Sequence, residues 1–239
     1  MRLALECRPD LLELVQPFAD FDFILAHEVL GNPEYLEFYK ESTKEKIVDN
    51  SVNELGEPST LEELGEAFSE VSADYVVSPD WIGDSLRTRN AYLESIKVFG
   101  KDKVIGVVQG ETYEEAINCL RTYGGIVAVP YDICSKKSDP PWAMGLRRAL
   151  VVCNIPLDFQ IHLLGFTSLD EFIYYENRPN VWSIDTGIPI LLGLESKDIL
   201  DPLSSKEKPT YNLMENKKVT QENWTAICRN IALLRRYLP

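Results

Sequence analysis

The chain has 239 residues, of which 45% are hydrophobic, and it carries a formal net charge of −14. This length supports one buried core and predicts a single domain over residues 1–239, while the acidic charge opposes polyanion binding through a broad basic surface. The sequence shows neither a basic-then-apolar leader nor an apolar run near the ~18 residues of a membrane span, so we expect a cytosolic protein that does not bind membranes.

Eight short apolar runs recur along the chain and predict eight β-strands. They are Leu3–Cys7, Phe21–His27, Lys46–Asp49, Tyr75–Pro79, Val104–Gln109, Gly125–Pro130, Phe159–Leu164 and Val181–Asp185. Their apolar character is continuous and does not alternate with polar residues. This pattern is typical of parallel strands that are covered on both faces.

Segments with helical periodicity separate these runs. They are Pro9–Phe18, Pro33–Tyr39, Thr60–Val71, Asp84–Phe99, Thr112–Tyr123, Pro141–Val151 and Ser168–Glu176. Asn32 is an expected N-cap, and Thr60 and Thr112, each followed three residues later by Glu, predict capping boxes. The alternation of strand and helix predicts an α/β fold of the (β/α)8 TIM-barrel type, with an open doubly wound sheet as the alternative.

The alternation loosens after the eighth strand. Residues 195–218 are rich in Lys, Ser, Pro, Glu and Asp, which predicts a surface loop. Residues 221–238 form an amphipathic pattern and predict a terminal helix that closes the barrel.

The cysteines and the basic residues restrict the disulfides, metal sites and nucleic-acid contacts that we expect. The cysteines, which are scattered without a C-x-x-C pair, are expected to be reduced and mostly buried, with no disulfide framework and no zinc site. They are Cys7, Cys119, Cys134, Cys153 and Cys228. A nucleic-acid substrate needs a local basic patch; the candidates are Lys136-Lys137, Arg147-Arg148, Arg229, Arg235 and Arg236, which are otherwise ordinary solvated charges.

Polar side chains stand where the predicted strands end. In a parallel barrel these ends meet at one mouth, so residues distant in sequence become neighbours. The residues are Glu6, His27, Asp49, Asp80, Gln109, Tyr131, Asp132 and Asp185. Carboxylates that face each other in a partly dry mouth raise some of their pKa values, which suits one as a nucleophile and another as a proton donor or acceptor.

Six segments in order between residues 46 and 190 carry a resemblance to a known family. They are Ile47-Val48-Asp49-Asn50-Ser51, Asp80 with Thr88-Arg89, Gly106-Val107-Val108-Gln109-Gly110, Gly124–Val129, His162-Leu163-Leu164-Gly165 and Ser183–Pro189. In this order they resemble the T-D-S-G-G-F, F-D-E-C-T…T-R-E, G-I-V-Q-G, I-G-G-L-A-V-G, Y-L-M-G-V and M-F-D-C-V-x-P-T-R motifs of the tRNA-guanine transglycosylases. That family consists of barrels that exchange bases such as queuine, its precursors and the archaeosine precursor.

The resemblance implies catalytic roles for two aspartates. Asp185 matches the nucleophile that attacks the anomeric carbon and holds a covalent glycosyl-enzyme intermediate. Asp49 matches the general acid/base that handles the proton of the leaving and incoming base. This chemistry is physically sound, because an ionised carboxylate stabilises and captures the oxocarbenium-like charge that forms when a base leaves a sugar.

The resemblance also implies a site for a guanine or 7-deazaguanine-like base. Asp80 would accept hydrogen bonds from the donor edge of the base, and Gln109 would supply an amide to its carbonyl edge. Ser51 and Gly110, which lie in the same motifs as Asp49 and Gln109, are also predicted to bind the substrate. Tyr131 is a candidate for stacking on the flat ring of the base.

Departures from the family motifs weaken the resemblance to the tRNA-guanine transglycosylases. The Cys-rich zinc site that follows the eighth strand in the family has no counterpart, Pro-Thr-Arg is replaced by Pro189-Ile190-Leu191, and Pro130 stands where a glycine contacts the base. They imply a trimmed relative without zinc, of the kind associated with DNA base modification or phages. The substrate would be a nucleic acid or a nucleoside, and a homodimer or a heteromeric partner is compatible with the chain.

Each candidate residue also has a structural interpretation. In this interpretation the three aspartates cap turns or helices; they are Asp49, Asp80 and Asp185. Gln109 is then an ordinary strand terminus, and His162 is a hydrogen-bonded core residue. Two further functions therefore stay open. One is a barrel hydrolase or lyase that uses the same acids with Mg²⁺, although no His-acid spacing demands a metal. The other is a non-catalytic binding subunit of a transglycosylase.

Overall fold

The structure is a computed structural model that describes residues 1–135, 139–165, 168–200 and 218–239. Eight parallel strands form one sheet in the order β1-β8-β7-β6-β5-β4-β3-β2. They are β1 (Arg2–Leu5), β2 (Asp22–Leu25), β3 (Lys46–Asp49), β4 (Tyr75–Val77), β5 (Val104–Val107), β6 (Ile126–Pro130), β7 (Gln160–Leu164) and β8 (Val181–Thr186). Each strand falls on one of the eight predicted runs. The pairing of β1 with β8 confirms the barrel and contradicts the open doubly wound alternative.

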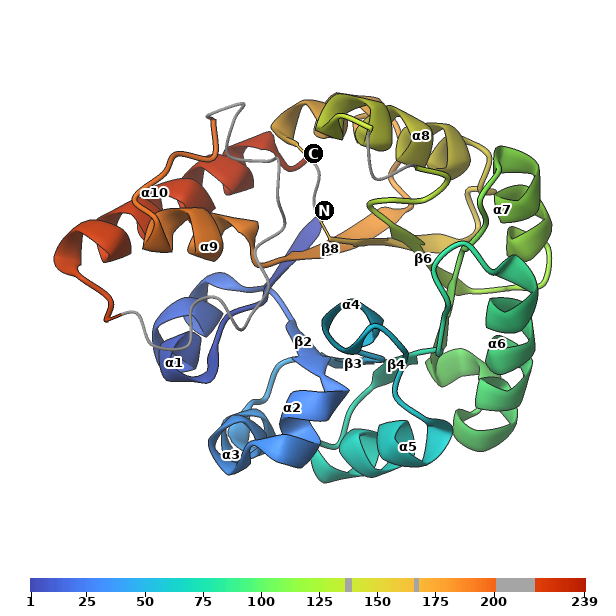
Figure 1. The fold of residues 1–239 in the computed structure, drawn as a ribbon, viewed down its shortest axis with the longest axis horizontal. Coiled ribbons are helices and arrows are strands. Elements are labelled where there is room, and N and C mark those ends of the chain that lie inside the picture. The colour runs from blue at the N-terminus through green and yellow to red at the C-terminus, as the bar shows by residue number, and fades with distance from the viewer. Residues whose placement is uncertain (136–138, 166–167, 201–217) are drawn as a thin grey trace.

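Helices surround the strands, as Figure 1 shows. The α-helices are α1 (Leu12–Val15), α2 (Ala26–Gly31), α3 (Pro33–Glu41), α4 (Val52–Leu55), α5 (Leu61–Glu70), α6 (Ser85–Phe99), α7 (Tyr113–Leu120), α8 (Pro141–Cys153), α9 (Ile188–Leu194) and α10 (Gln221–Tyr237). The 3₁₀ segments are η1 (Pro9–Leu11), η2 (Gln16–Phe18), η3 (Lys101–Lys103) and η4 (Leu169–Tyr175). Within the described ranges no helix is long and apolar enough to cross a membrane.

The capping residues act as the sequence predicts. Asn32 Oδ1 accepts hydrogen bonds from the backbone N–H groups of Glu34 and Tyr35, at 3.1 and 3.3 Å. Thr60 and Thr112 both form complete capping boxes with the Glu three residues later. These bonds satisfy backbone donors that the first helical turn leaves without partners.

Several predicted boundaries are wrong. The run Phe21–His27 ends as a strand at Leu25, because α2 begins at Ala26, so His27 lies on a helix. Pro9–Phe18 breaks into η1, α1 and η2, and Ser168–Glu176 forms the 3₁₀ segment η4.

The terminal helix is confirmed as α10, which packs on α9. A Cβ atom added to Gly193 of α9 would lie 2.4 Å from Ile227 Cγ1, so the two helices approach at a contact that only glycine permits. Most of the predicted surface loop, residues 201–217, lies outside the described residues. At its start Ile199 is buried, and its N–H donates to Asn230 Oδ1 of α10 at 3.1 Å.

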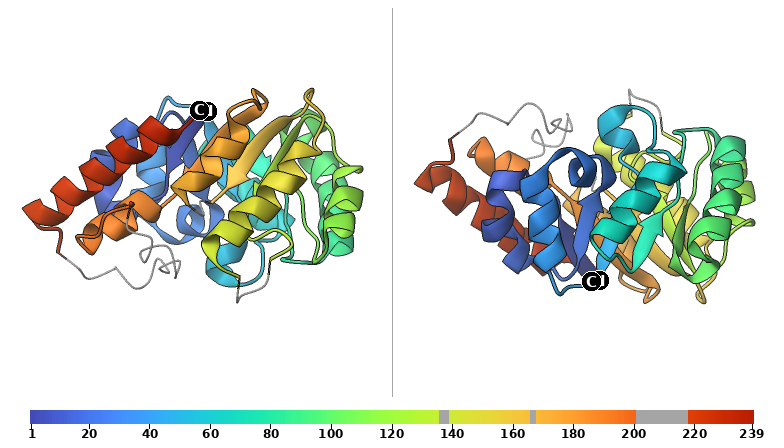
Figure 2. Two further views of the ribbon diagram at one scale, coloured as in Figure 1. Left: turned by 90° about the horizontal axis from the view of Figure 1, so that it is seen from above. Right: turned by 90° about the horizontal axis from the view of Figure 1, so that it is seen from below.

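The barrel is nearly closed, and its seam lies between β1 and β2. Asp20, just before β2, joins the two strands where no regular ladder does. Leu3 N–H donates to Asp20 Oδ2 at 2.8 Å, and Asp20 N–H donates to Leu3 O at 2.7 Å. The two ends of the chain also meet, since the Met1 ammonium donates to Pro239 O at 2.6 Å, and both ends coincide in the two views of Figure 2.

The core has two layers, which follow from the alternation of side chains along each strand. One apolar cluster packs between the strands and the surrounding helices and contains Leu3, Ile24, Val48, Val76 and Leu163. The other is smaller and fills the barrel interior, with Phe21, Phe23, Ile47, Val77, Ile105, Val107 and Ala128. Side chains in register with this inner cluster therefore point into the barrel.

Candidate active site

Because side chains alternate between the two faces of a strand, three of the predicted residues point into the mouth of the barrel. Asp49 follows the interior residue Ile47 by two positions, and Gln109 follows the interior residue Val107 by two. Asp185 has the same orientation as Ser183, since the intervening Ile184 belongs to the outer layer. All three side chains are buried, with 8%, 3% and 2% of Asp49, Gln109 and Asp185 exposed.

Asp185 is held through one of its two carboxylate oxygens. Asp185 Oδ1 accepts a hydrogen bond from the Gly165 N–H at 3.1 Å and lies 3.0 Å from His162 Nε2. No bond is found to Oδ2 among the described residues. The carboxylate is thus oriented through Oδ1.

His162 is the partner of Asp185 inside the barrel. Its ring is completely buried, stacks on Phe23 at a centroid distance of 5.2 Å and meets the edge of Phe21 at 6.1 Å. Burial, with the nearby positive charge of Arg148, lowers the pKa of His162 to about 3, so the ring is neutral at pH 7. A neutral ring has one N–H. If that N–H lies on Nε2 and donates to Asp185, then Nδ1 accepts from the Ser183 hydroxyl at 2.8 Å.

Asp49 is held at the same mouth and has a strongly perturbed pKa. Burial raises this pKa well above the usual value, and the negative charges of Glu54, Asp185 and Glu6 raise it further. The Ser51 N–H, which donates to Asp49 Oδ2 at 2.8 Å, acts in the opposite direction. Asp49 therefore holds a proton at pH values where an ordinary aspartate is ionised.

Asp80 and Gln109 lie together, in direct contact. Gln109 Nε2 donates to Asp80 Oδ2 at 2.6 Å, while Gln109 Oε1 accepts from the Gly83 N–H at 3.1 Å. Asn50 Nδ2 donates to the other oxygen of Asp80 at 2.7 Å. Burial raises the pKa of Asp80 to about 6 in spite of these bonds, and the charge of Asp132 contributes in the same direction.

The remaining substrate-binding candidates differ in exposure. Ser51 is buried in a left-handed conformation (φ 61°), and its hydroxyl accepts from the His27 N–H at 3.4 Å. Gly110 is buried against α7. Tyr131 is partly exposed at the end of β6, where its N–H donates to Leu164 O of β7. The substrate-binding role of all three stays a prediction.

Sequence reasoning missed two residues that complete the candidate site. Asn50 bonds to Asp80 and to Ser78 O, and because it follows Asp49 it links the two aspartate clusters. His162 was interpreted as a core histidine, and it is one, yet it also contacts Asp185. The position of His162 between the outer-layer residues Ile161 and Leu163 was the signal that its ring faces the interior.

The candidate basic patch is largely occupied by acidic partners. Arg147 pairs with Asp139, Arg229 with Asp198 and Arg235 with Asp20. The prediction that Arg148 is a solvated surface charge is wrong, because its side chain is completely buried and pairs with Glu171. Lys136-Lys137 lies outside the described residues, and Arg236 is exposed.

The cysteines are free thiols, but the expectation that most are buried is wrong. Cys7 and Cys119 are buried, Cys134 and Cys228 are partly exposed, and Cys153 is exposed where α8 ends. Among the residues that the structure describes, no group of three or more His, Cys, Asp or Glu side chains is arranged to hold a metal ion.

The chain matches no protein-family model, and a search of curated proteins finds no similar sequence. Fold and site therefore define only a class. The protein is a nearly closed parallel eight-stranded α/β barrel of the TIM type, with buried carboxyl groups at the C-terminal ends of its strands. Barrels of this class are commonly enzymes, and their active sites lie at this end.

Proposed function

We propose that this protein is a transglycosylase-like enzyme that cleaves or exchanges the N-glycosidic bond to a guanine or 7-deazaguanine-like base. The observation that carries the proposal is the pair Asp49 and Asp185. Both are buried at one mouth and interact electrostatically, but their surroundings differ. Asp185 Oδ1 accepts the Gly165 N–H, whereas the pKa of Asp49 is raised well above its usual value. Two carboxyl groups in such contrasting environments suit a nucleophile and a proton donor.

The chemistry follows from this difference. Asp185 Oδ2 attacks the anomeric carbon of the sugar, and the bond from that carbon to the base nitrogen breaks as the new C–O bond forms. The electron pair of the broken bond stays on the base nitrogen, which takes the proton from Asp49. In the reverse half, Asp49 removes a proton from the incoming base. That base nitrogen then attacks the anomeric carbon and releases Asp185.

Asp80 and Gln109 supply a recognition site for the base. Asp80, when ionised, accepts from the N–H groups of a guanine-like edge, and the amide of Gln109 pairs with the adjacent carbonyl. Because the two side chains bond to each other at 2.6 Å, a bound base replaces that bond with its own. The exchange of partners keeps both buried groups satisfied and disfavours a base without this donor edge.

The sequence motifs support the same function. Asp49, Asp80, Gln109 and Asp185 stand at motif positions that resemble those of the tRNA-guanine transglycosylases. The backbone at Ser51 provides an independent hint, because its left-handed conformation favours glycine, which the family motif has at this position. The sugar would belong to a nucleic acid or a nucleoside.

Replacement of the nucleophile tests the proposal. Wild-type protein incubated with a guanosine-containing RNA, DNA or nucleoside and labelled guanine or 7-deazaguanine should incorporate the label and form a covalent adduct that survives denaturation. The Asp185→Asn variant should form neither. Asp132→Asn, which changes another mouth carboxyl, is the matched control and should retain the adduct.

Three results would reject the assignment. Label incorporation that persists in Asp185→Asn excludes this residue as the nucleophile. Activity that disappears with a chelator and returns with Mg²⁺ or Mn²⁺ favours the metal-dependent hydrolase or lyase. Base binding without exchange in every substrate class favours the non-catalytic subunit.

A further inference from the structure

A buried ion pair lies behind the end of β7, outside the barrel interior. Arg148 of α8 and Glu171 of η4 are 0% and 1% exposed. Arg148 Nε and Nη2 donate to the two oxygens of Glu171 at 2.5 and 2.7 Å, and the Tyr175 hydroxyl donates to Glu171 Oε1 at 2.6 Å. This bidentate hydrogen bonding fixes the plane of the guanidinium group.

The other edge of the guanidinium group holds the backbone where β7 ends. Arg148 Nη1 donates to Leu164 O at 3.0 Å and to Gly165 O at 2.9 Å. A single side chain thus joins α8, η4 and the carboxyl end of β7. Leu164 O also accepts a hydrogen bond from the Tyr131 N–H at 2.9 Å, whereas Arg148 is the donor found for Gly165 O among the described residues.

Gly165 transmits this constraint to the candidate nucleophile. Its backbone is in the left-handed region (φ 69°), which glycine adopts without strain. While its carbonyl faces Arg148, its N–H donates to Asp185 Oδ1 at 3.1 Å. Opposite sides of one residue therefore contact the buried ion pair and the carboxylate.

Stability alone does not account for this ion pair. Removing two charges from water costs free energy that their mutual attraction barely offsets, so apolar residues of the same volume fill such a space equally well. The geometry gives a more specific result, a fixed direction for the Gly165 N–H. Donors that are oriented before reaction are effective because they need no rearrangement as charge changes on the nucleophile.

We propose that Arg148, with Glu171 and Tyr175, is a positioning group that orients Asp185 through the backbone of Gly165. The catalytic consequence rests on the proposed function, whereas the structural link from Arg148 to Gly165 does not. Lys at position 148 keeps the positive charge, but its single nitrogen with three N–H donors cannot reproduce the four hydrogen bonds of the planar guanidinium group. Arg148→Lys should therefore loosen Gly165 while the fold is retained.

The structural link is measured by NMR of the Gly165 amide. In wild type this amide should exchange slowly with solvent, and its chemical shift should change in Asp185→Asn. Arg148→Lys should shift the same resonance and accelerate its exchange by at least about tenfold, a loss of protection comparable to one net hydrogen bond. Tyr175→Phe, which removes one bond to Glu171, should give a smaller change in the same direction.

Arg178→Lys is the matched control. Arg178 also ties together this part of the barrel, because its Nη2 donates to Val152 O and Ile155 O, but it does not contact Gly165. Its replacement should leave the Gly165 resonance unchanged at equal melting temperature. An unchanged Gly165 amide in folded Arg148→Lys, or in Tyr175→Phe should the former fail to fold, overturns the proposal.

The catalytic consequence is measured by kinetics. Arg148→Lys should lower kcat by roughly tenfold to a hundredfold with KM nearly unchanged, since a displaced nucleophile affects the reaction step more than binding. If wild type shows no exchange activity, the proposed function fails while the NMR experiment still tests the positioning role. An altered Gly165 amide with unchanged kcat overturns the catalytic role of the ion pair.

Discussion

Asp49 and Asp185 show how two identical side chains acquire different chemical properties. Asp49 accepts one backbone hydrogen bond and faces the charges of Glu54, Asp185 and Glu6. Asp185 receives the Gly165 N–H and contacts a neutral His162. Burial and these negative charges raise the pKa of Asp49 and therefore favour a proton on it.

Asp49→Asn should stabilise the protein while it abolishes activity. The folded-state pKa of Asp49 is raised, so its contribution to stability is present below the unfolded pKa and is lost as the pH rises toward the folded one. Asparagine never ionises and still offers an oxygen to the Ser51 N–H. We expect a gain in unfolding free energy at pH 8 that shrinks toward pH 4. Urea unfolding at both pH values measures it, and a gain that does not depend on pH would contradict the assignment.

Base binding should depend on the ionisation of Asp80. Its pKa is raised to about 6, so the carboxylate that accepts from the base predominates above that pH, and the protonated form, which has lost an acceptor, predominates below it. The affinity for a soluble 7-deazaguanine should fall by about tenfold per pH unit below pH 6. Calorimetric titrations between pH 5 and 8 measure this fall. Asp80→Asn should bind weakly at every pH, and a wild-type affinity that is flat across this range would exclude Asp80 as the acceptor.

At the scale of elements, the sequence predicts those with strong local signals. The eight strands are continuous apolar runs, and α3, α5 and α7 begin with side chains that cap them. The helices α4 and α9 were not predicted, because their N-cap residues Ser51 and Gly187 make no capping bond through a side chain. Both helices are short and depend on tertiary packing.

The candidate site was predictable only where it lies on strand ends. Asp49, Gln109 and Asp185 follow from the alternation of side chains on β-strands, but the Arg148–Glu171 pair depends on how α8 packs on η4. Arg147 and Arg148 are adjacent and of the same type, and they differ in the helix face that they occupy. Arg148 lies on the buried face of α8 with Gly145, Ala149 and Val152, whereas Arg147 is exposed.

The turn between β5 and α7 depends on Gly110. A Cβ atom at this position would lie 2.7 Å from Ala116 N and 2.8 Å from Glu115 Cβ. Gly110→Ala should therefore push α7 away, displace the neighbouring Gln109 and cost about 1–3 kcal/mol of unfolding free energy, with weaker base binding. Thermal unfolding and base titration test both effects.

Gly65→Ala is the control for this prediction. Gly65 lies in α5 with nothing within 4 Å of an added Cβ, so alanine should stabilise the protein by about 0.5–1 kcal/mol without altering base binding. Equal effects of the two substitutions would show that the close approach at Gly110 is unimportant.

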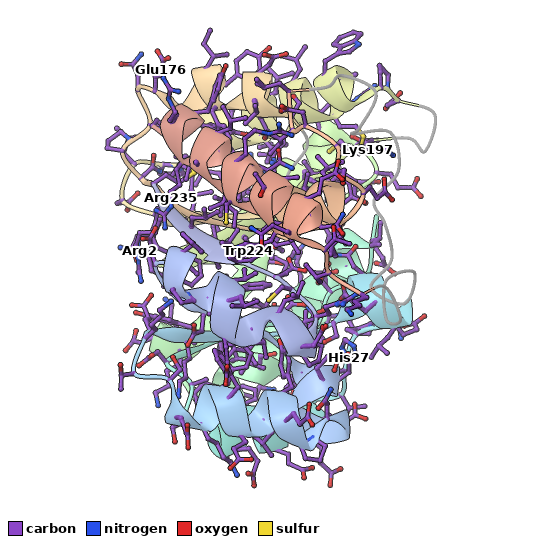
Figure 3. All side chains as sticks on the ribbon, turned by 90° about the vertical axis from the view of Figure 1, so that its left-hand side faces the viewer. Arg2, His27, Glu176, Lys197, Trp224 and Arg235 are labelled. Atoms are coloured by element: carbon purple, nitrogen blue, oxygen red, sulfur yellow. The ribbon has the colours of Figure 1, made fainter. Side chains whose placement is uncertain are left out.

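At the scale of the whole molecule, the barrel closes through side chains of distant segments. Arg235 of α10 binds both oxygens of Asp20, at 2.7 and 2.9 Å, and Asp20 in turn accepts from the Leu3 N–H. Figure 3 shows Arg2 and Arg235 on the left side of the view and His27 on its right side. The terminal helix thus covers the seam at the amino ends of the strands, away from the mouth.

Asp20→Asn tests this closure. Burial acts to raise the pKa of Asp20, but the hydrogen bonds from Arg235 and Leu3 outweigh it and lower the pKa. A lowered folded-state pKa means that the stabilisation is present above the unfolded pKa and is lost as the pH falls through the folded one. Both side chains are about one-third exposed, so solvent screening limits the loss at pH 7 to about 1 kcal/mol or less.

A double-mutant cycle isolates the contribution of the Arg235–Asp20 ion pair to barrel closure. Asp20→Asn, Arg235→Met and the double variant should give non-additive unfolding free energies at pH 7, and the coupling should weaken as the pH falls through the lowered folded-state pKa of Asp20. The exposed pair Lys97 and Glu94 within α6 serves as control and should show a coupling of at most a few tenths of a kcal/mol, because it joins no distant segments. A coupling at Asp20 no larger than that control would mean that the Arg235–Asp20 pair does not contribute measurably to closing the seam.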